Sequence, residues 1–167
     1  MTRADPLPHL AAVARALTEP GQPLATFRAL DSALDRVLGH KLFTILLHHD
    51  ATRESERVYT NQPAAYPVGG RKPLRDTAWG RQVIHDRRPF IGRTPADIVE
   101  HFPDHALIAS LGCASIINLP VVWNDRLLGT INLLHEERWY DDADVPTGLA
   151  FAALAVPAYL LAASRLA

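Results

Sequence analysis

Residues 114–135 read ASIINLPVVWNDRLLGTINLLH, and they give the clearest structural signal in the chain of 167 residues. Apolar residues dominate both halves, from Ala114 to Val122 and from Arg126 to His135. Between them stands the pair Asn124-Asp125, and a two-residue loop is the shortest connection between antiparallel strands. The segment therefore predicts a β-hairpin.

The residues before the hairpin predict two helices and two more strands. Apolar residues recur at helical spacing from about Leu10 to Leu17, and again from Leu24 to Leu38, where Gly39 follows as a stop signal. The apolar run Leu42–Leu47 does not alternate with polar residues, so it predicts a central strand buried on both faces. Glu56–Thr60 predicts a neighbouring strand across a polar turn.

The middle of the chain predicts a long loop followed by short elements. Residues 61–72 hold two prolines and the pair Gly69-Gly70, which exclude a helix and a central strand alike. Thr77 is placed to cap a helix, and Pro89 precedes a short strand. Two short helical segments follow, at residues 95–101 and 106–111. The last element is a long helix from about Asp142 to Ala167, with acidic residues at its start.

The run Leu107–Val121, a tight turn, the run Leu128–Leu134 and the closing helix together resemble a GAF domain. The order of the earlier elements agrees, so the resemblance covers residues 24–165. It implies an α+β fold with an antiparallel sheet of five or six strands and the N- and C-terminal helices on one face. A loop and short-helix insertion would cover a small-molecule pocket on the other face. We divide the chain into an N-terminal helical extension, residues 1–23, and a GAF domain, residues 24–167.

Polar residues inside the apolar strands are the first candidates for ligand contact. A buried amide or hydroxyl without a hydrogen bond costs about 1–3 kcal/mol, so such residues either bond one another and the backbone or face a ligand. Both interpretations remain open from the sequence. The candidates in the strands are Thr44, Ser115, Asn118 and Asn132.

The segment Tyr59–Lys72 supplies a second group of candidates. Its prolines stiffen the loop, its glycines let the backbone approach a ligand closely, and its tyrosines and asparagine supply directional hydrogen bonds. An ordered loop without ligand contact is the alternative. From this segment and the helix after it we take Tyr59, Asn61, Tyr66, Lys72 and Trp79.

Charge patterning points to the kind of ligand. With 17 basic and 18 acidic residues, the formal charge of −1 argues against binding to nucleic acid or acidic membranes. Residues 53–93, however, hold nine basic and four acidic side chains, a balance of +5. We therefore expect a small anionic or aromatic ligand, with solvated surface arginines as the alternative.

The sequence shows no recognisable signature for catalysis, a metal or a cofactor; we expect no metal and no cofactor, and we favour a protein that is not an enzyme while leaving that question open. The single cysteine, Cys113, cannot form an intrachain disulfide or the cysteine pair used by free methionine sulfoxide reductases, a branch of the same family. Its neighbours do not match a bilin attachment site either. His101 and His105 are separated by Pro103 and do not form a helical zinc pair. Two alternatives remain: a ligand-free dimeric interaction module, and a small enzyme that uses His135, Glu136, Tyr59 or Lys72.

The closing helix raises the question of a membrane. Val145–Ser164 carries no charge over 20 residues, which is long enough to span a bilayer. A helix that packs on a sheet and on a partner's helix is also apolar around most of its surface. We therefore expect no membrane span. We expect a homodimer through the terminal helices, as is common in GAF domains. Because no secretory signal is visible, we also expect a cytoplasmic location. The expected role is that of a sensor in signal transduction.

Overall fold

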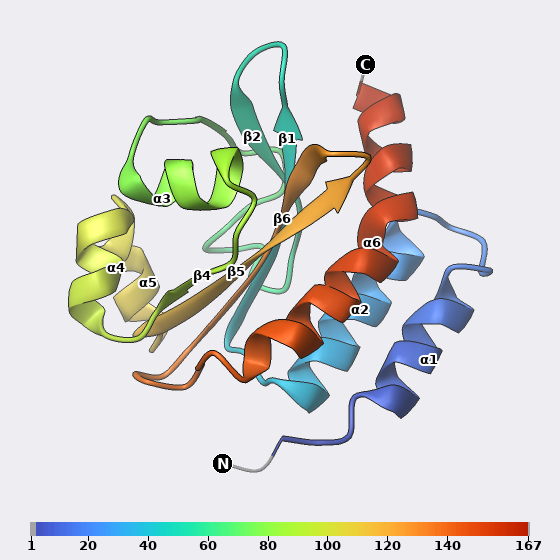
Figure 1. Ribbon diagram of the computed structural model, residues 1–167, viewed down its shortest axis with the longest axis horizontal. Helices are drawn as coiled ribbons and strands as arrows, with labels where there is room; N and C mark the ends of the chain where they lie inside the picture. The colour runs from blue at the N-terminus through green and yellow to red at the C-terminus, as the bar shows by residue number, and fades with distance from the viewer. Residues whose placement is uncertain (1–2, 167) are drawn as a thin grey trace.

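The computed structural model describes residues 3–166 and places a six-stranded antiparallel sheet between two sets of helices (Figure 1). The strands lie in the order β3-β2-β1-β6-β5-β4. Helices α1, α2 and α6 cover one face, and the insertion that carries α3, α4 and α5 covers the other (Figure 1). In chain order the elements are α1 Leu7–Ala16, α2 Leu24–Val37, β1 Leu42–His49, β2 Glu54–Thr60, β3 Arg71–Pro73, α3 Ala78–Gly80, the π-helical turn η1 Arg81–His85, β4 Phe90–Gly92, α4 Pro95–His101, α5 His105–Ser110, β5 Ser115–Trp123, β6 Arg126–His135 and α6 Asp144–Leu166.

The predicted hairpin is confirmed. Strands β5 and β6 pair from Ser115 opposite His135 to Trp123 opposite Arg126. Asn124 and Asp125 both have positive φ, at 48° and 59°, as the type I′ turn that favours tight hairpins requires. Strand β6 also pairs with β1, so the hairpin lies at the centre of the sheet.

The face under α1, α2 and α6 holds the larger hydrophobic core. Phe27 of α2 and Tyr159 of α6 are buried there, with their ring centroids 5.9 Å apart. The guanidinium of Arg3 pairs with the Asp144 carboxylate at 2.8 Å and donates to the carbonyl of Leu38, which ties the N-terminal segment to α2 and α6. Residues 3–23 thus pack as part of the helical layer. The division into an extension and a GAF domain stays a prediction, and its end at residue 167 lies outside the described residues.

The other face is covered by the insertion, as the resemblance implied. A smaller hydrophobic cluster joins it to the sheet, with Val83, Phe90, Ile98 and Ile108 among its buried members. The Thr77 side chain accepts a hydrogen bond from the Gly80 amide at 3.0 Å, which confirms the predicted cap of α3. The predicted loop ends in β3, a short strand at the edge of the sheet, where prolines are tolerated.

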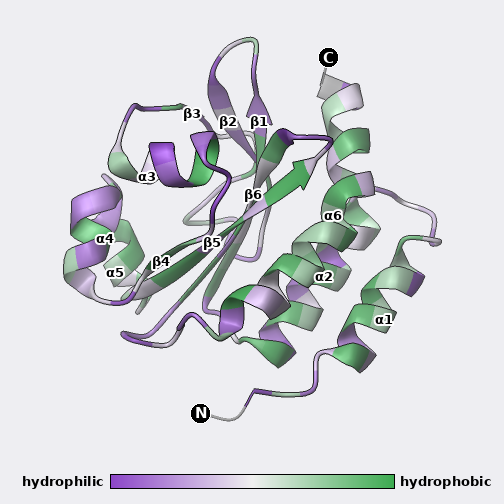
Figure 2. Cartoon of the chain, viewed as in Figure 1, coloured by the Kyte–Doolittle hydropathy of each residue, from purple (hydrophilic) through white to green (hydrophobic). Residues whose placement is uncertain are grey.

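Helix α6 is apolar around much of its surface (Figure 2). Within the described residues it is the one helix long and apolar enough to cross a bilayer, over Asp144–Arg165. Of an apolar run of 18 residues within that stretch, 44% is buried inside the structure, where α6 packs against β5 and α2. A core helix has the same length and composition. The absence of a membrane span stays a prediction.

Within residues 3–166, the buried side-chain polar atoms that lack a hydrogen-bond partner all lie on the insertion face. Among the described residues they are Nε2 of His48, Nε of Arg57 and Oγ1 of Thr130. All three residues lie on the strand face that also carries Thr44, because Leu46, two residues after Thr44, stands opposite both Arg57 and Thr130. Such atoms are rare in native proteins, and a bound molecule or an ordered water is one way in which they find a partner.

Gly129 of β6 allows β1 to approach closely. A Cβ added there would overlap the carbonyl oxygen of Leu46 and lie 2.7 Å from the Tyr159 ring. We predict that Gly129→Ala costs about 3 kcal/mol of unfolding free energy, at the upper end for overpacking. Gly69→Ala is the control, because its φ of +86° is strained for alanine but nothing lies within 4 Å of the added Cβ; it should cost about 1 kcal/mol. Urea unfolding of both variants measures the two losses of unfolding free energy. Equal losses would contradict the prediction.

Stability should also fall in acid because of His48. Burial lowers the pKa of His48 to about 4, below its usual 6.5. The unfolded chain binds the proton first, so stability falls as pH drops from 6.5 towards 4, by about 3 kcal/mol at pH 4. His48→Phe replaces the imidazole with an aromatic ring that does not titrate. Its free energy of unfolding should therefore fall less than that of the wild type over this pH range. Identical pH profiles for the two proteins, measured by urea unfolding, would show that His48 does not titrate as described.

Candidate ligand-binding site

A row of hydrogen bonds crosses the centre of the sheet on the insertion face. Thr44 of β1 stands opposite Asn132 of β6, which stands opposite Asn118 of β5. The Asn118 amide donates to Oδ1 of Asn132 at 2.6 Å, and the Asn132 amide donates to Oγ1 of Thr44 at 3.1 Å. Above the sheet, Nε1 of Trp79 donates to Oδ1 of Asn118 at 2.9 Å. Trp79 thereby joins the insertion to a row of hydrogen bonds that runs across three adjacent strands, β5, β6 and β1.

The row has a direction that matters for chemistry. Each member from Trp79 to Asn132 donates to the next, and Thr44 accepts at the end. The Thr44 hydroxyl donates to no other residue in the described chain, so its proton is available. Consecutive hydrogen bonds polarise one another in a buried site. Thr44 can therefore donate to a ligand acceptor.

A cavity of about 340 Å³ lies over this row. Its floor is formed by Leu42, Thr44 and Leu46 of β1 with their neighbours on β5 and β6, and Trp79 and Phe102 of the insertion cover it. The two aromatic rings meet edge to face at 6.0 Å. Pockets for small molecules have this size and this combination of apolar walls with a few polar groups.

One side of the cavity is built around the Asp104 carboxylate. It accepts from the Tyr66 hydroxyl at 2.8 Å and pairs with Nζ of Lys72 at 3.2 Å. Burial by itself would raise the pKa of Asp104, but Lys72 and Tyr66 outweigh it and hold that pKa below its usual range. Burial and the bond to Asp104 raise the pKa of Tyr66, so both residues keep their ordinary protonation states at neutral pH.

Arg57 of β2 adds a charge that is largely buried. Arg57 is only 8% exposed. Its guanidinium lies 4.8 Å from the centre of the Tyr66 ring, and one of its terminal nitrogens donates to the Pro67 carbonyl. Its Nε has no partner among the described residues. Burial lowers the pKa of Arg57, although the group stays charged. With Lys72 and Arg75, three cationic side chains and one carboxylate line the cavity.

The structure brings six of the nine predicted residues to this cavity and places three elsewhere. The hydroxyl of Tyr59 donates to Asp31 at 2.7 Å on the helix side of the sheet. Asn61 accepts from the Phe43 amide at 2.8 Å, and Ser115 donates to the Glu136 carbonyl at 2.6 Å. These three side chains satisfy neighbouring groups of the fold. The six in the cavity are Thr44, Tyr66, Lys72, Trp79, Asn118 and Asn132.

Arg57 and Asp104 are the two buried or half-buried charged residues of the cavity that are missing from the predicted set, which also lacks Ser55, Arg75, Thr77 and His101. A charge within a strand is a signal, but an irregularity in the pairing between Ile45 and Leu46 shifts the register, so simple alternation from Tyr59 misplaces Arg57. Asp104 lies in a short connection between α4 and α5 and carries no local signal.

The groups considered for an enzyme do not meet in this cavity. The His135 ring stacks on Trp139 at 3.5 Å, and Glu136 pairs with Lys41 at 3.0 Å. Burial raises the pKa of the Cys113 thiol to about 11, so the thiol stays protonated. Within residues 3–166 no three His, Cys, Asp or Glu side chains cluster to hold a metal ion.

Comparison with known proteins places this geometry in a family. The GAF domain family matches residues 23–158. A search of curated proteins found no match. The fold is similar to the GAF domain of a phosphoenolpyruvate-protein phosphotransferase from Acinetobacter, at 10% identity, TM-score 0.77 and 98% coverage of both chains. It is also similar to the GAF domain of such a phosphotransferase from Coxiella burnetii, at 14% identity, TM-score 0.75 and coverage of 96% and 95% of this and that chain.

A third similar structure is the free methionine-R-sulfoxide reductase from Neisseria meningitidis in complex with its substrate. The identity is 15%, the TM-score 0.73, and the match covers 99% of this chain and 96% of that one. At these identities the likeness concerns the fold alone. The match over residues 23–158, the six-stranded sheet and the cavity between sheet and insertion agree with one another. This chain belongs to the GAF domain family.

Proposed function

We propose that this protein is a sensory or regulatory GAF domain that binds a small anionic or aromatic molecule in the cavity above Asn132. GAF domains typically bind small molecules. The observation that carries the proposal is the hydrogen-bonded row from Trp79 to Thr44, which ends in a free hydroxyl proton beneath a cavity with excess positive charge.

The cavity suits a ligand with an apolar or aromatic body and one acidic group. The body would lie between Leu42 on the floor and the rings of Trp79 and Phe102. The acidic group would meet the cationic side chains of Arg57 and Lys72. A ligand that donates a hydrogen bond to Oδ1 of Asn118 would compete with Trp79 and loosen α3, which gives binding a way to change the surface of the protein.

Two other functions are less well supported. For the small enzyme that would use His135, Glu136, Tyr59 or Lys72, only Lys72 lies in the cavity, where it forms an ion pair with Asp104. A ligand-free interaction module would have a filled interior, which a cavity of about 340 Å³ does not favour. We further propose a cytoplasmic protein that binds neither nucleic acid nor a cofactor.

The proposed homodimer would form through an apolar stripe on α6. Leu149, Ala153, Pro157 and Leu160 are all exposed, the two leucines by 36% and 41%. Their spacings of four, four and three place them along one side of the helix. Because a continuous exposed apolar stripe is unfavourable in water, a second copy of the chain is the partner that we propose for it.

Ligand binding should depend on Lys72. We predict that at least one member of a panel of small carboxylates and aromatic acids raises the melting temperature by about 5 °C at saturating concentration. Lys72→Gln should abolish the shift, because it removes a cation and leaves Asp104 to repel the acid. Arg15→Gln, which removes an exposed charge from α1, is the control and should keep the shift. The proposal would be contradicted if no compound of the panel raised the melting temperature, or if Lys72→Gln showed the same rise as the wild type.

The dimer is tested by light scattering after size-exclusion chromatography. The wild type should have twice the chain mass, and the double variant Leu149→Lys with Leu160→Lys should be a monomer, because two buried charges disfavour the interface. Leu107→Lys changes a leucine of similar exposure, 38%, on the insertion side and should remain a dimer. A monomeric wild type would refute the proposed interface.

A further inference from the structure

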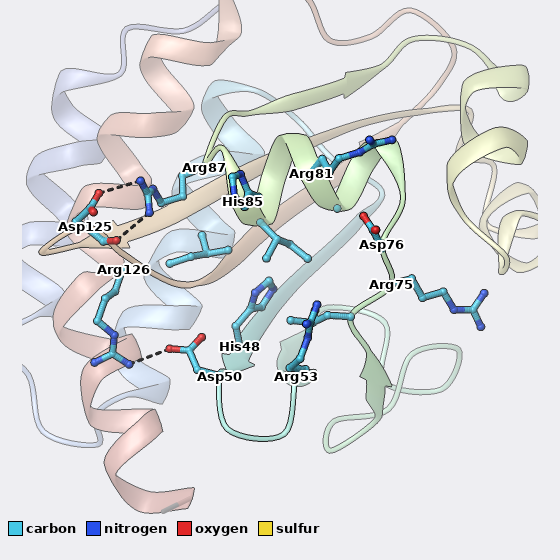
Figure 3. Close-up of a pocket in the computed structure, with 14 residues that line it drawn as sticks. His48, Asp50, Arg53, Arg75, Asp76, Arg81, His85, Arg87, Asp125 and Arg126 are labelled. Atoms are coloured by element: carbon cyan, nitrogen blue, oxygen red, sulfur yellow. Dashed lines mark hydrogen bonds and ion pairs between the residues drawn. The ribbon is translucent and has the colours of Figure 1, made fainter.

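A second cavity, of about 570 Å³, lies on the same face of the sheet, near the turns that follow β1 and β5 (Figure 3). Residues of the β1–β2 turn, the segment before α3, the turn η1 and the tip of the β5–β6 hairpin surround it. Leu74 and Arg75 line both cavities, but the hydrogen-bonded row from Trp79 to Thr44 belongs to the first alone.

The lining of this second cavity is unusually rich in charge. Two ion pairs close one end: Arg126 with Asp50 at 3.1 Å and Arg87 with Asp125 at 2.9 Å (Figure 3). The other arginine and aspartate side chains in the lining are three arginines and one aspartate. They make no side-chain hydrogen bond or ion pair within the described chain. They are Arg53, Arg75, Arg81 and Asp76.

His48 supplies a buried polar group to the same cavity. The residue is 9% exposed, and its Nε2 has no hydrogen-bond partner among the described residues. Figure 3 shows the ring of His48 and the side chain of Arg53 both extending towards η1, whereas Arg75 and Arg81 point outwards at the rim. Burying a ring nitrogen without a partner is costly unless a ligand provides one.

The rest of the wall is apolar. Leu74, Ile84 and Leu127 line the cavity and are only partly exposed. The cavity therefore combines an apolar surface with the unpartnered ring nitrogen of His48 and the guanidinium of Arg53. At its rim, Arg75 and Arg81 bring the balance of these charges, against the one carboxylate of Asp76, to an excess of about two positive charges. A phosphate monoester carries between one and two negative charges at neutral pH and offers three acceptor oxygens, so it matches this excess better than a carboxylate.

We propose that the second cavity is a binding site for a small phosphate monoester with an apolar body. Its phosphate accepts hydrogen bonds from Nε2 of His48 and from the guanidinium of Arg53, and its apolar body lies against Leu74, Ile84 and Leu127. The site is separate from the cavity over Asn132 and does not depend on the function proposed for that cavity.

Calorimetric titration of the full chain with phenyl phosphate tests the proposal. Because phenyl phosphate also has the aromatic body and acidic group proposed for the ligand of the first cavity, the decisive titration uses Lys72→Gln, which disables that cavity. In this background we expect saturable binding of one molecule per chain, weakened about tenfold or more when Arg53→Gln or His48→Gln is added. Arg53 is exposed, so Arg53→Gln should keep the fold even if His48→Gln does not. Arg15→Gln on the opposite face, added to the same background, is the matched control and should leave the binding unchanged. Benzoate, which has the same ring and a single charge, should bind more weakly than phenyl phosphate.

Three results would overturn the proposal. The first is the absence of saturable binding up to about 10 mM phenyl phosphate. The second is an equal loss of affinity in Arg53→Gln and Arg15→Gln, which would indicate attraction by overall charge alone. The third is a loss in Lys72→Gln with full binding in Arg53→Gln, which would assign the phosphate to the first cavity. That result would leave the function proposed for the first cavity intact, so the two proposals fail separately.

Discussion

The hydrogen-bonded row from Trp79 through Asn118 and Asn132 to Thr44 is the constraint on which the insertion face depends. Two amides and a hydroxyl buried in an apolar sheet would each cost about 1–3 kcal/mol without partners. Because the three strand residues stand directly opposite one another, each satisfies the next. Trp79 completes the row and fixes α3 over the sheet. A change in the pairing of β1, β6 or β5 would break these bonds, so the row also specifies the register of the central strands.

The two faces of the sheet differ in how they are completed. The helix face is closed by apolar side chains, with Phe27, Phe151 and Tyr159 fully or almost fully buried. The insertion face holds the cavities and the three buried polar atoms without partners found among the described residues. Small helices joined by prolines and glycines cannot cover a sheet as completely as three long helices do. This incomplete cover leaves room for ligands.

The basic character of residues 53–93 has a structural explanation. Of the nine basic side chains in that segment, six line one of the two cavities, namely Arg53, Arg57, Lys72, Arg75, Arg81 and Arg87. Residues that look like a solvated basic stretch in the sequence are therefore divided between two sites on one face. The shared residues Leu74 and Arg75 lie where the two sites meet.

The sequence by itself determined the order of the elements, the central hairpin, the cap at Thr77 and the family, because these follow from local periodicity, turn chemistry and spacing. It also identified six of the residues around the first cavity, since polar groups inside apolar strands and a loop rich in glycine and proline are visible without a structure. Only the tertiary structure decided that Tyr59, Asn61 and Ser115 bond to the fold, and that Arg57 and Asp104 join the cavity. Those placements depend on an irregular strand pairing and on contacts between residues far apart in the chain, such as Tyr66 with Asp104, 38 positions away, which no local pattern encodes.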